Sequence, residues 1–291
     1  MVSLDLLSSL DGLVWLQSGE LVGKYFQQHQ TTVSRNHKKC AEVFGIKLIK
    51  QEGIWSVEGP CELLNLERNV HQLARFKGQA PLRLESNNWI SGALSSPSPK
   101  SWITGSCKPQ GVKRCFDLIR QRVIDAWLCP SNEAPLAEPD LTIYPLCKVP
   151  MRLMVASEHP LLRNSVPSLE QIKKYPWRQM PRGAYPEIER LLKSLNLWST
   201  LKQHQHLDKQ EWEGLSKQSV TLQVGSVLSQ HNNQNPLSPV SLDLGAETGV
   251  ALVIRKDNSE HNAIQNLKTS LGIKLIEEQK RYPEIRISMQ P

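Results

Sequence analysis

The feature that most constrains this chain is an alternation of strand-like and helix-like segments from Pro81 onward. Short apolar runs bounded by turn residues predict strands at 82–85, 102–105, 123–128, 151–157, 220–225 and 250–256. Between them lie apolar stripes at helical spacing, such as the one formed by Ile188, Leu191, Leu192 and Leu195. Such alternation is typical of an α/β fold with mainly parallel sheets. The length of 291 residues favours about two domains.

The N-terminal 58 residues have a different pattern, that of short helices followed by a hairpin. Apolar residues recur at helical spacing through 4–26, which predicts two short helices. The hydroxyls of Thr31 and Thr32 are suited to cap a third helix. Residues 46–58 have the pattern of a small β-hairpin with Gly53 near its tip. This segment therefore forms a unit distinct from the α/β part.

A further amphipathic helix is predicted over residues 61–77. Its apolar residues are spaced three, four and three positions apart, as in a two-stranded coiled coil: Leu63, Leu66, Val70 and Leu73. Gly78 and Pro81 end the helix. The stripe fits either a helix packed on its own domain or one that pairs two subunits, because fewer than three heptads do not decide between them.

Positive charge is concentrated in one part of the N-terminal segment. The whole chain has 35 basic and 28 acidic side chains, a formal net charge of +7. Residues 1–80 hold 9 Lys and Arg against 8 Asp and Glu, a net charge of only +1. Within 35–50, however, one acid, Glu42, stands against five basic residues, which are Arg35, Lys38, Lys39, Lys47 and Lys50. Such a local patch suits a polyanionic partner.

A short helix, a tight turn and a second helix form a unit whose second helix can enter the major groove of DNA. Here the start of that second helix carries amide, hydroxyl and guanidinium groups, which hydrogen-bond base edges and phosphates. We therefore predict double-stranded DNA as a partner, bound by Gln30, Thr31, Thr32, Ser34, Arg35 and Lys38. A polar helix face exposed to solvent is the alternative interpretation.

This segment resembles the winged helix-turn-helix of LysR-type transcriptional regulators. The sequence VSR at 33–35 stands at the family's Val-Ser-Arg, and FGIKL at 44–48 matches its Leu-Gly-Val-Arg-Leu stretch. Later segments that resemble the family lie at 122–128, 146–162, 166–177, 249–257 and 263–271, so the resemblance covers roughly residues 5–275. The chain is identified as a divergent member of this family.

The resemblance implies an effector-controlled regulator in three parts. Residues 1–58 would form a winged helix-turn-helix, 59–80 a linker helix that pairs subunits as homodimers or homotetramers, and 81–291 a periplasmic-binding-protein-like effector domain. That domain would have subdomain I (81–148 plus 236–291) and subdomain II (149–235), with a small-molecule effector between them. Candidate effector-binding residues follow strand ends, where such ligands bind: Ser86, Asn87, Thr104, Ser131 and Gly225.

Several positions depart from the family pattern. Val22-Gly23 replaces an alanine pair, His37 stands at an apolar position, and Lys50-Gln51 follows where the family has a wing arginine. These departures leave open a second function, that of a ligand-binding or interaction protein derived from such regulators that no longer binds DNA specifically. A transferase or hydrolase on a two-lobed α/β scaffold is a third.

No motif predicts an enzyme, a cofactor or a metal centre. The GxSxG, Walker A, HExxH and GxGxxG patterns are absent from the sequence. His204 and His206 have chelate spacing but lie in a polar stretch, so no metal is predicted there. The six cysteines have no CxxC spacing and are interpreted as reduced thiols in helices and cores, with a redox or metal role as the alternative.

The hydropathy of the sequence argues against a membrane partner. Mean hydropathy is −0.39, and no apolar run approaches the roughly 20 residues of a membrane helix. The first residues lack the basic and apolar regions of a signal peptide. We therefore expect a cytoplasmic protein.

Overall fold

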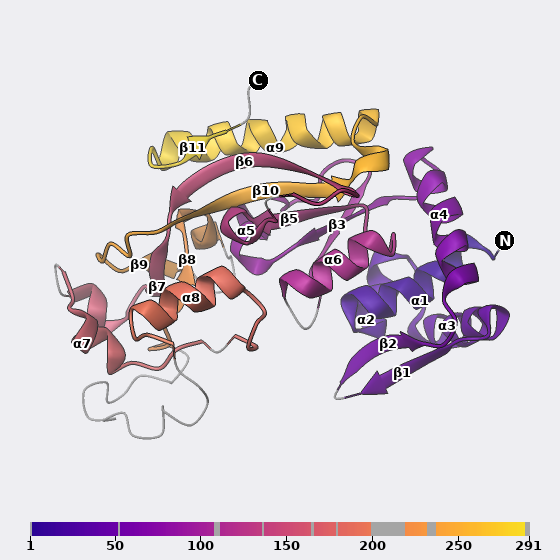
Figure 1. Ribbon diagram of the computed structural model, residues 1–291, viewed down its shortest axis with the longest axis horizontal. Helices are drawn as coiled ribbons and strands as arrows, with labels where there is room; N and C mark the ends of the chain where they lie inside the picture. Colours follow the sequence, from indigo (N-terminus) through magenta and orange to yellow (C-terminus); the bar gives the residue numbers. More distant parts are fainter. Residues whose placement is uncertain are drawn as a thin grey trace.

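The computed structural model describes residues 2–51, 53–107, 111–135, 137–163, 166–178, 180–198, 219–231 and 237–288. A central sheet lies between an N-terminal helical unit at one end and a smaller sheet at the other (Figure 1). The polar stretch 199–218, with His204 and His206, lies outside the described residues.

The N-terminal unit consists of three helices and a hairpin, as predicted. The elements are α1 (Leu4–Leu16), α2 (Gly19–Tyr25), α3 (Gln30–Phe44), β1 (Lys47–Gln51) and β2 (Ile54–Glu58), and the two strands pair antiparallel. Ser3 and Ser18 cap α1 and α2, because each side chain accepts a hydrogen bond from a backbone N–H of the first turn. Thr31 and Thr32 do not cap α3 as expected, since the helix already begins at Gln30.

The turn between α2 and α3 is closed tightly around Gly23. A Cβ atom added at Gly23 would lie 2.5 Å from the carbonyl oxygen of Gln28, closer than real Cβ contacts come. Only glycine fits this approach without a shift of the backbone. The departure Val22-Gly23 is therefore compatible with a compact helix-turn-helix, in which the Val22 side chain is fully buried.

The central sheet has six strands in the order β11-β6-β10-β5-β3-β4. They are β3 (Leu82–Ser86), β4 (Trp102–Gly105), β5 (Ala126–Pro130), β6 (Leu141–Pro150), β10 (Glu247–Arg255) and β11 (Arg286–Ile287). Strand β3 pairs in parallel with β4 and β5, whereas β10 pairs antiparallel with both β5 and β6. The expectation of mainly parallel sheets is wrong, because β10 returns from the smaller sheet and inserts between β5 and β6 in the opposite direction.

The smaller sheet has three antiparallel strands in the order β8-β7-β9. They are β7 (Arg152–Ala156), β8 (Gln223–Gly225) and β9 (Leu237–Pro239), with helices α7 (Leu169–Lys173) and α8 (Pro186–Ser194). Because β9 pairs with β7, the chain returns to the central sheet after residue 239, not at 236 as the resemblance implied. The short 3-10 helices are η1 (Ser131–Glu133), η2 (Pro160–Arg163), η5 (Val227–His231) and η6 (Lys256–Asn258).

Two predicted strands are shorter than the sequence indicated. Of the run 123–128, the strand begins only at Ala126, because the chain turns at Arg122, whose φ is 60°. Of the run 220–225, only Gln223–Gly225 is strand. In both cases apolar residues before the strand are buried without being in the sheet, and apolar pattern alone does not separate these two situations.

The helices divide the two faces of the central sheet between them. On one face α5 (Asn88–Leu94) and α9 (Asn262–Arg281) pack over buried residues such as Leu84 and Leu252. On the other face α6 (Val112–Arg120) and α1 pack together, so that Trp15 and Trp127 belong to one apolar cluster. The N-terminal unit therefore shares a hydrophobic core with the central sheet and gains stability from the same buried surface.

Candidate nucleic-acid interface and interdomain cavity

Helix α3 has one buried face and one exposed polar face. Its buried residues are Val33, His37, Cys40 and Ala41. Of the predicted DNA-binding residues, Thr32 is half-buried, and those exposed to solvent are Gln30, Thr31, Ser34, Arg35 and Lys38. The amphipathic pattern of α3 thus brings these side chains to one surface of the molecule.

His37 lies on the buried face of α3 and contacts the hairpin. Its Nδ1 is 3.0 Å from the Val33 carbonyl oxygen, and its ring centroid is 5.7 Å from that of Trp55 in β2. Burial lowers the pKa of His37, the Val33 carbonyl opposes this shift, and the charge of Lys38 adds to it. The neutral ring therefore takes the place of an apolar side chain in this core, with Nδ1–H assigned as the donor.

Replacing His37 by leucine is expected to reduce the loss of stability on acidification. Because the folded-state pKa is lowered, the unfolded chain binds the proton more strongly, so the contribution of His37 is fully present above about pH 6.5 and declines below it. Thermal unfolding of both proteins at pH 7.5 and pH 5 measures the effect. An equal fall in Tm for the two proteins would contradict this role of His37.

A groove lies between α3 and the hairpin on the same side of the N-terminal unit. Its volume is about 500 Å³, and its lining includes Gln30, Ser34, Lys38, Lys50 and Trp55. The Lys50 ammonium lies 5.6 Å from the centre of the Trp55 ring, within the range of a cation–π contact. Helix α3 and the hairpin thus present basic and polar groups along one concave surface.

Helix α4 (Glu62–Phe76) has one face exposed to solvent and one face buried in the protein. The predicted apolar stripe is exposed: Leu63 is 64%, Leu66 65%, Val70 43% and Leu73 51% accessible. The opposite face packs on the protein through Leu64 and Phe76 and through buried charged and polar residues. The stripe therefore does not pack on its own domain, which was one of the two interpretations of the sequence.

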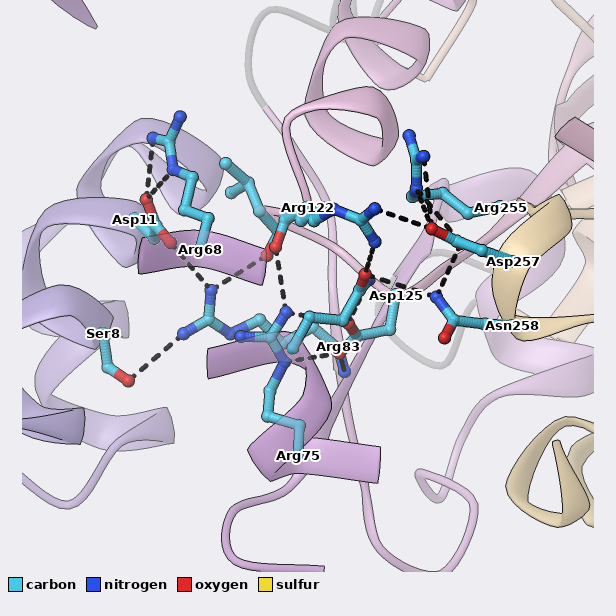
Figure 2. Close-up of polar contacts among 12 residues, drawn as sticks. Ser8, Asp11, Arg68, Arg75, Arg83, Arg122, Asp125, Arg255, Asp257 and Asn258 are labelled. Atoms are coloured by element: carbon cyan, nitrogen blue, oxygen red, sulfur yellow. Dashed lines mark hydrogen bonds and ion pairs between the residues drawn. The ribbon is translucent and has the colours of Figure 1, made fainter. Parts of the chain in front are cut away.

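The buried face of α4 carries two arginines that join the N-terminal unit to the central sheet (Figure 2). Arg68 Nε donates to Asp11 Oδ1 of α1 at 2.8 Å, and Arg75 Nε and Nη2 donate to the two carboxylate oxygens of Asp125 at 2.8 Å each. All four side chains are almost inaccessible to solvent. Sequence reasoning missed this network, although charged residues on the face opposite an apolar stripe were its visible signal.

Arg83 of β3 also connects the central sheet to helix α1 of the N-terminal unit. Its guanidinium donates to the Val123 carbonyl oxygen at 2.9 Å, to Ser8 Oγ at 3.2 Å and to Asp11 Oδ2 at 3.4 Å. Burial lowers the pKa of Arg83 to about 10, and the charge of Arg75 adds to this shift. The side chain remains cationic near neutral pH and completes the contacts of Asp11 (Figure 2).

A small cavity lies where the central and smaller sheets meet. Its lining includes Trp89, Pro130, Met151, Gly225 and Thr248. The volume is about 20 Å³, which leaves room for about one water molecule. A cavity of this size is far smaller than the pockets that hold small organic ligands.

The predicted effector-binding residues do not all meet at this cavity. Gly225 lines it, but Ser86, Asn87, Thr104 and Ser131 are not among its lining residues. Ser86 and Asn87 are buried at the end of β3, where Asn87 is the N-cap of α5. Thr104 is half-buried in β4 and Ser131 is half-buried in η1. Of the five candidates, only Gly225 therefore lines this cavity.

Glu133 of η1 joins the two halves beside the cavity. Its carboxylate accepts hydrogen bonds from the backbone N–H of Ile188 at 2.9 Å and of Glu187 at 3.3 Å, in the first turn of α8. Burial raises the pKa of Glu133, although these two N–H groups oppose the shift. A carboxylate at a helix N-terminus is favourable. Sequence analysis missed this contact, because a lone acid in a polar loop carries no periodic signal.

Comparison with known proteins found a family model that matches a segment of the α/β part. Residues 106–197 match the family described as the LysR substrate binding domain. This segment is therefore similar to a LysR substrate binding domain, which agrees with the predicted resemblance to LysR-type transcriptional regulators. No curated protein matches the sequence. The described residues contain no helix that is both long and apolar enough to cross a membrane.

Solved structures of full-length regulators resemble the chain at low identity. A variant of OxyR from Pseudomonas aeruginosa has 15% identity and a TM-score of 0.46, and the match covers 93% of this chain and 95% of that one. CbnR, a LysR family transcriptional regulator, has 13% identity and a TM-score of 0.48, with 94% and 99% covered. Full-length BenM has 16% identity and a TM-score of 0.44, with 97% and 99% covered.

Proposed function

We propose that this protein is a cytoplasmic, sequence-specific DNA-binding transcriptional regulator of the LysR type that is controlled by a small-molecule effector. The observation that carries the proposal is the exposed polar face of α3 in a helix-turn-helix unit, beside a polar groove whose charged lining residues are Lys38, Lys50 and Glu20. The substrate-binding domain supports control by a ligand. DNA binding would use the α3 surface, while the α/β part would adjust it.

Each residue type on α3 has a distinct task in this proposal. Gln30 and Arg35 hydrogen-bond adenine and guanine edges, for which their side chains have matching donors and acceptors. Thr31, Thr32 and Ser34 contact phosphates or the thymine methyl group, and Lys38 lies one turn further, suited to a flanking phosphate. Residues 1–58 would thus bind the duplex.

The exposed stripe of α4 would pair two subunits. The segment 59–80 would pack against its own copy in a second subunit. This pairing removes large apolar side chains from water, namely Leu63, Leu66, Val70 and Leu73. A two-fold dimer would present two α3 helices to successive major grooves, about 34 Å apart. Homotetramers would follow from further contacts between α/β parts.

The effector would bind between the two halves of residues 81–291. Because the cavity holds about one water in the closed form, a small molecule needs the halves to separate, and Gly225 is the candidate contact that already lines the cavity. An effector that binds one arrangement better than the other shifts the population toward it. By linkage, DNA and effector then change each other's affinity by the same factor.

Arg35→Ala is expected to lower the discrimination between a selected operator and random DNA by about 1–3 kcal/mol. The operator is selected from random-sequence duplexes with the full chain, and affinity is measured over a salt titration. The unchanged protein should lose affinity with a log–log slope of about −0.9 per phosphate neutralised. Arg190→Ala, which removes another exposed arginine, on α8, is the matched control and should leave discrimination unchanged.

Equal affinity for all duplexes, in both the unchanged protein and the Arg35→Ala variant, would contradict specific reading of DNA. That result would favour a ligand-binding protein derived from such regulators. Binding of a selected duplex that responds to Arg190→Ala but not to Arg35→Ala would move the DNA interface away from α3.

A further inference from the structure

A cluster of three possible metal ligands lies under the N-terminal unit, apart from the cavity between the two halves. Glu85 is near the end of β3, Cys107 follows β4, and Cys115 is in α6. Each residue offers one atom that can bind a metal, a sulfur or a carboxylate oxygen, and these three atoms lie within 4.8 Å of one another. All three residues are buried. Topology alone brings them together, since no two of them have the CxxC spacing of a local chelate.

The distance between the two sulfur atoms is close to that in a tetrahedral thiolate site. The two sulfur atoms of Cys107 and Cys115 are 3.6 Å apart. Two thiolates at the usual Zn–S distance of about 2.3 Å and a tetrahedral angle subtend about 3.8 Å between sulfurs. A carboxylate oxygen at about 2.1 Å completes the third corner at a similar separation. Only shifts of the order of 1 Å separate the present arrangement from ideal coordination.

The carboxylate of Glu85 is held in place by the indole N–H of Trp15 and by the backbone of Cys107. Trp15 Nε1 of α1 donates to Glu85 Oε2 at 2.6 Å, and the backbone N–H of Cys107 contacts Oε2 at 2.9 Å and Oε1 at 3.1 Å. The Cys107 thiol also hydrogen-bonds Glu85, and a cation bound by both residues would replace that contact, whereas the Trp15 and backbone N–H groups would remain. Hydrogen bonds of this kind orient metal-binding carboxylates in known sites.

We propose that Glu85, Cys107 and Cys115 bind one thiophilic divalent cation of the Zn²⁺ class, with water in the fourth position. Two thiolates and one carboxylate are a ligand set that zinc prefers over magnesium or calcium. The balanced step releases both thiol protons to solvent, M²⁺ + 2 RSH → M(SR)₂ + 2 H⁺, and no electron is transferred. The site is independent of the proposed DNA-binding function.

A cation at this place would tie the N-terminal unit to the central sheet. Glu85 belongs to the sheet, whereas Trp15, which fixes its carboxylate, belongs to α1. A metal that orders Glu85 therefore also strengthens the contact between these two units. The expected consequence is a rise in Tm when the cation is added to the chelator-treated chain, because a ligand that binds only the folded state stabilises it.

Cobalt substitution of the full-length chain tests the site. After chelator treatment and reduction, Co²⁺ titration should give thiolate-to-cobalt charge-transfer absorption in the near ultraviolet and tetrahedral bands in the visible, saturate at one ion per chain, and be reversed by Zn²⁺. Cys107→Ser and Cys115→Ser should lose the charge-transfer band. Cys147→Ala, which removes an equally buried thiol from β6, is the matched control and should keep it.

A further variant tests whether Trp15 supports the site by its hydrogen bond to Glu85 or only by packing. Trp15→Phe keeps an aromatic ring but removes the donor to Glu85, so the affinity for Co²⁺ should fall about 10–100-fold while the charge-transfer band at saturation is retained. An unchanged affinity would show that the Trp15 hydrogen bond does not support a metal site.

Alkylation of cysteines in the unchanged protein tests the same site without relying on the folding of the serine variants. Under mild denaturant, Zn²⁺ should protect Cys107 and Cys115 from alkylation but not Cys61, as measured by peptide mass spectrometry. The proposal is overturned if no charge-transfer band appears in the unchanged protein, if the band survives in both serine variants, or if Zn²⁺ protects neither cysteine. Recovery of a Cys107–Cys115 disulfide whose reduced form binds no Co²⁺ would also overturn it.

Discussion

An Asp125→Ala variant is expected to have a free energy of unfolding about 3–5 kcal/mol below that of the unchanged protein. The buried carboxylate accepts two hydrogen bonds from Arg75 at 2.8 Å, and one each from Gln72 Nε2 and the backbone N–H of Arg83 at 2.9 Å. Its removal leaves the Arg75 guanidinium buried opposite no countercharge. Chemical denaturation followed by circular dichroism measures the loss.

Asp140→Ala is the matched control for this experiment. Asp140 also pairs with an arginine, Arg120, but both side chains are more than a third exposed to solvent. Solvent screens such a pair, so its removal should cost about 0–1 kcal/mol. Equal losses for the two variants would mean that the buried pair contributes no more than an exposed one. The double variant Arg75→Met with Asp125→Leu should recover part of the loss, because no unpaired charge remains.

A Leu66→Asp variant is expected to be a monomer at concentrations where the unchanged chain is a dimer. Leu66 lies in the middle of the exposed stripe of α4 and is 65% accessible in the single chain. In a two-fold interface the substitution occurs twice, so about 3–6 kcal/mol of apolar burial is lost. The dimer dissociation constant should therefore rise about 100- to 10,000-fold. Analytical ultracentrifugation over a range of concentrations measures it.

Ile273→Asp provides the comparison for the dimer experiment. Ile273 is 55% exposed on α9, which packs over one face of the central sheet and is not part of the stripe of α4. Its replacement should leave the dissociation constant unchanged. An unchanged protein that is already monomeric would contradict pairing through α4, and a dimer that survives Leu66→Asp but not Ile273→Asp would assign subunit pairing to another surface.

The buried ion pairs of Asp11 and Asp125 fix α4 to both the N-terminal unit and the central sheet. Arg68 ties α4 to α1, Arg75 ties it to the start of β5, and Arg83 links α1 back to β3. The N-terminal unit, α4 and the central sheet therefore behave as one packed body, while the smaller sheet meets that body at the small cavity. In the proposed regulator, separation of the two halves is the motion left to respond to an effector.

The spacing of apolar residues predicted most of the helices and strands, but it did not predict strand direction or which side chains line a cavity. The helices at α3 and α4 and the hairpin at β1 and β2 follow from spacing and turn residues, which act over a few positions. The direction of β10 did not follow, because it depends on which strand the chain rejoins after leaving the smaller sheet. Likewise, the candidate effector residues were chosen by their distance from strand ends, whereas side-chain direction decides whether they line a cavity.

Local pattern by itself determined the helix-turn-helix unit, the polar face of α3 and the apolar stripe of α4, because each depends only on which residues share one face of a helix. Only the tertiary structure decided that the stripe is exposed, that Asp11 and Asp125 neutralise arginines from distant segments, and that Glu85, Cys107 and Cys115 meet. These contacts join residues 8 to 72 positions apart. Such pairings are set by how whole elements pack, which short-range spacing does not contain.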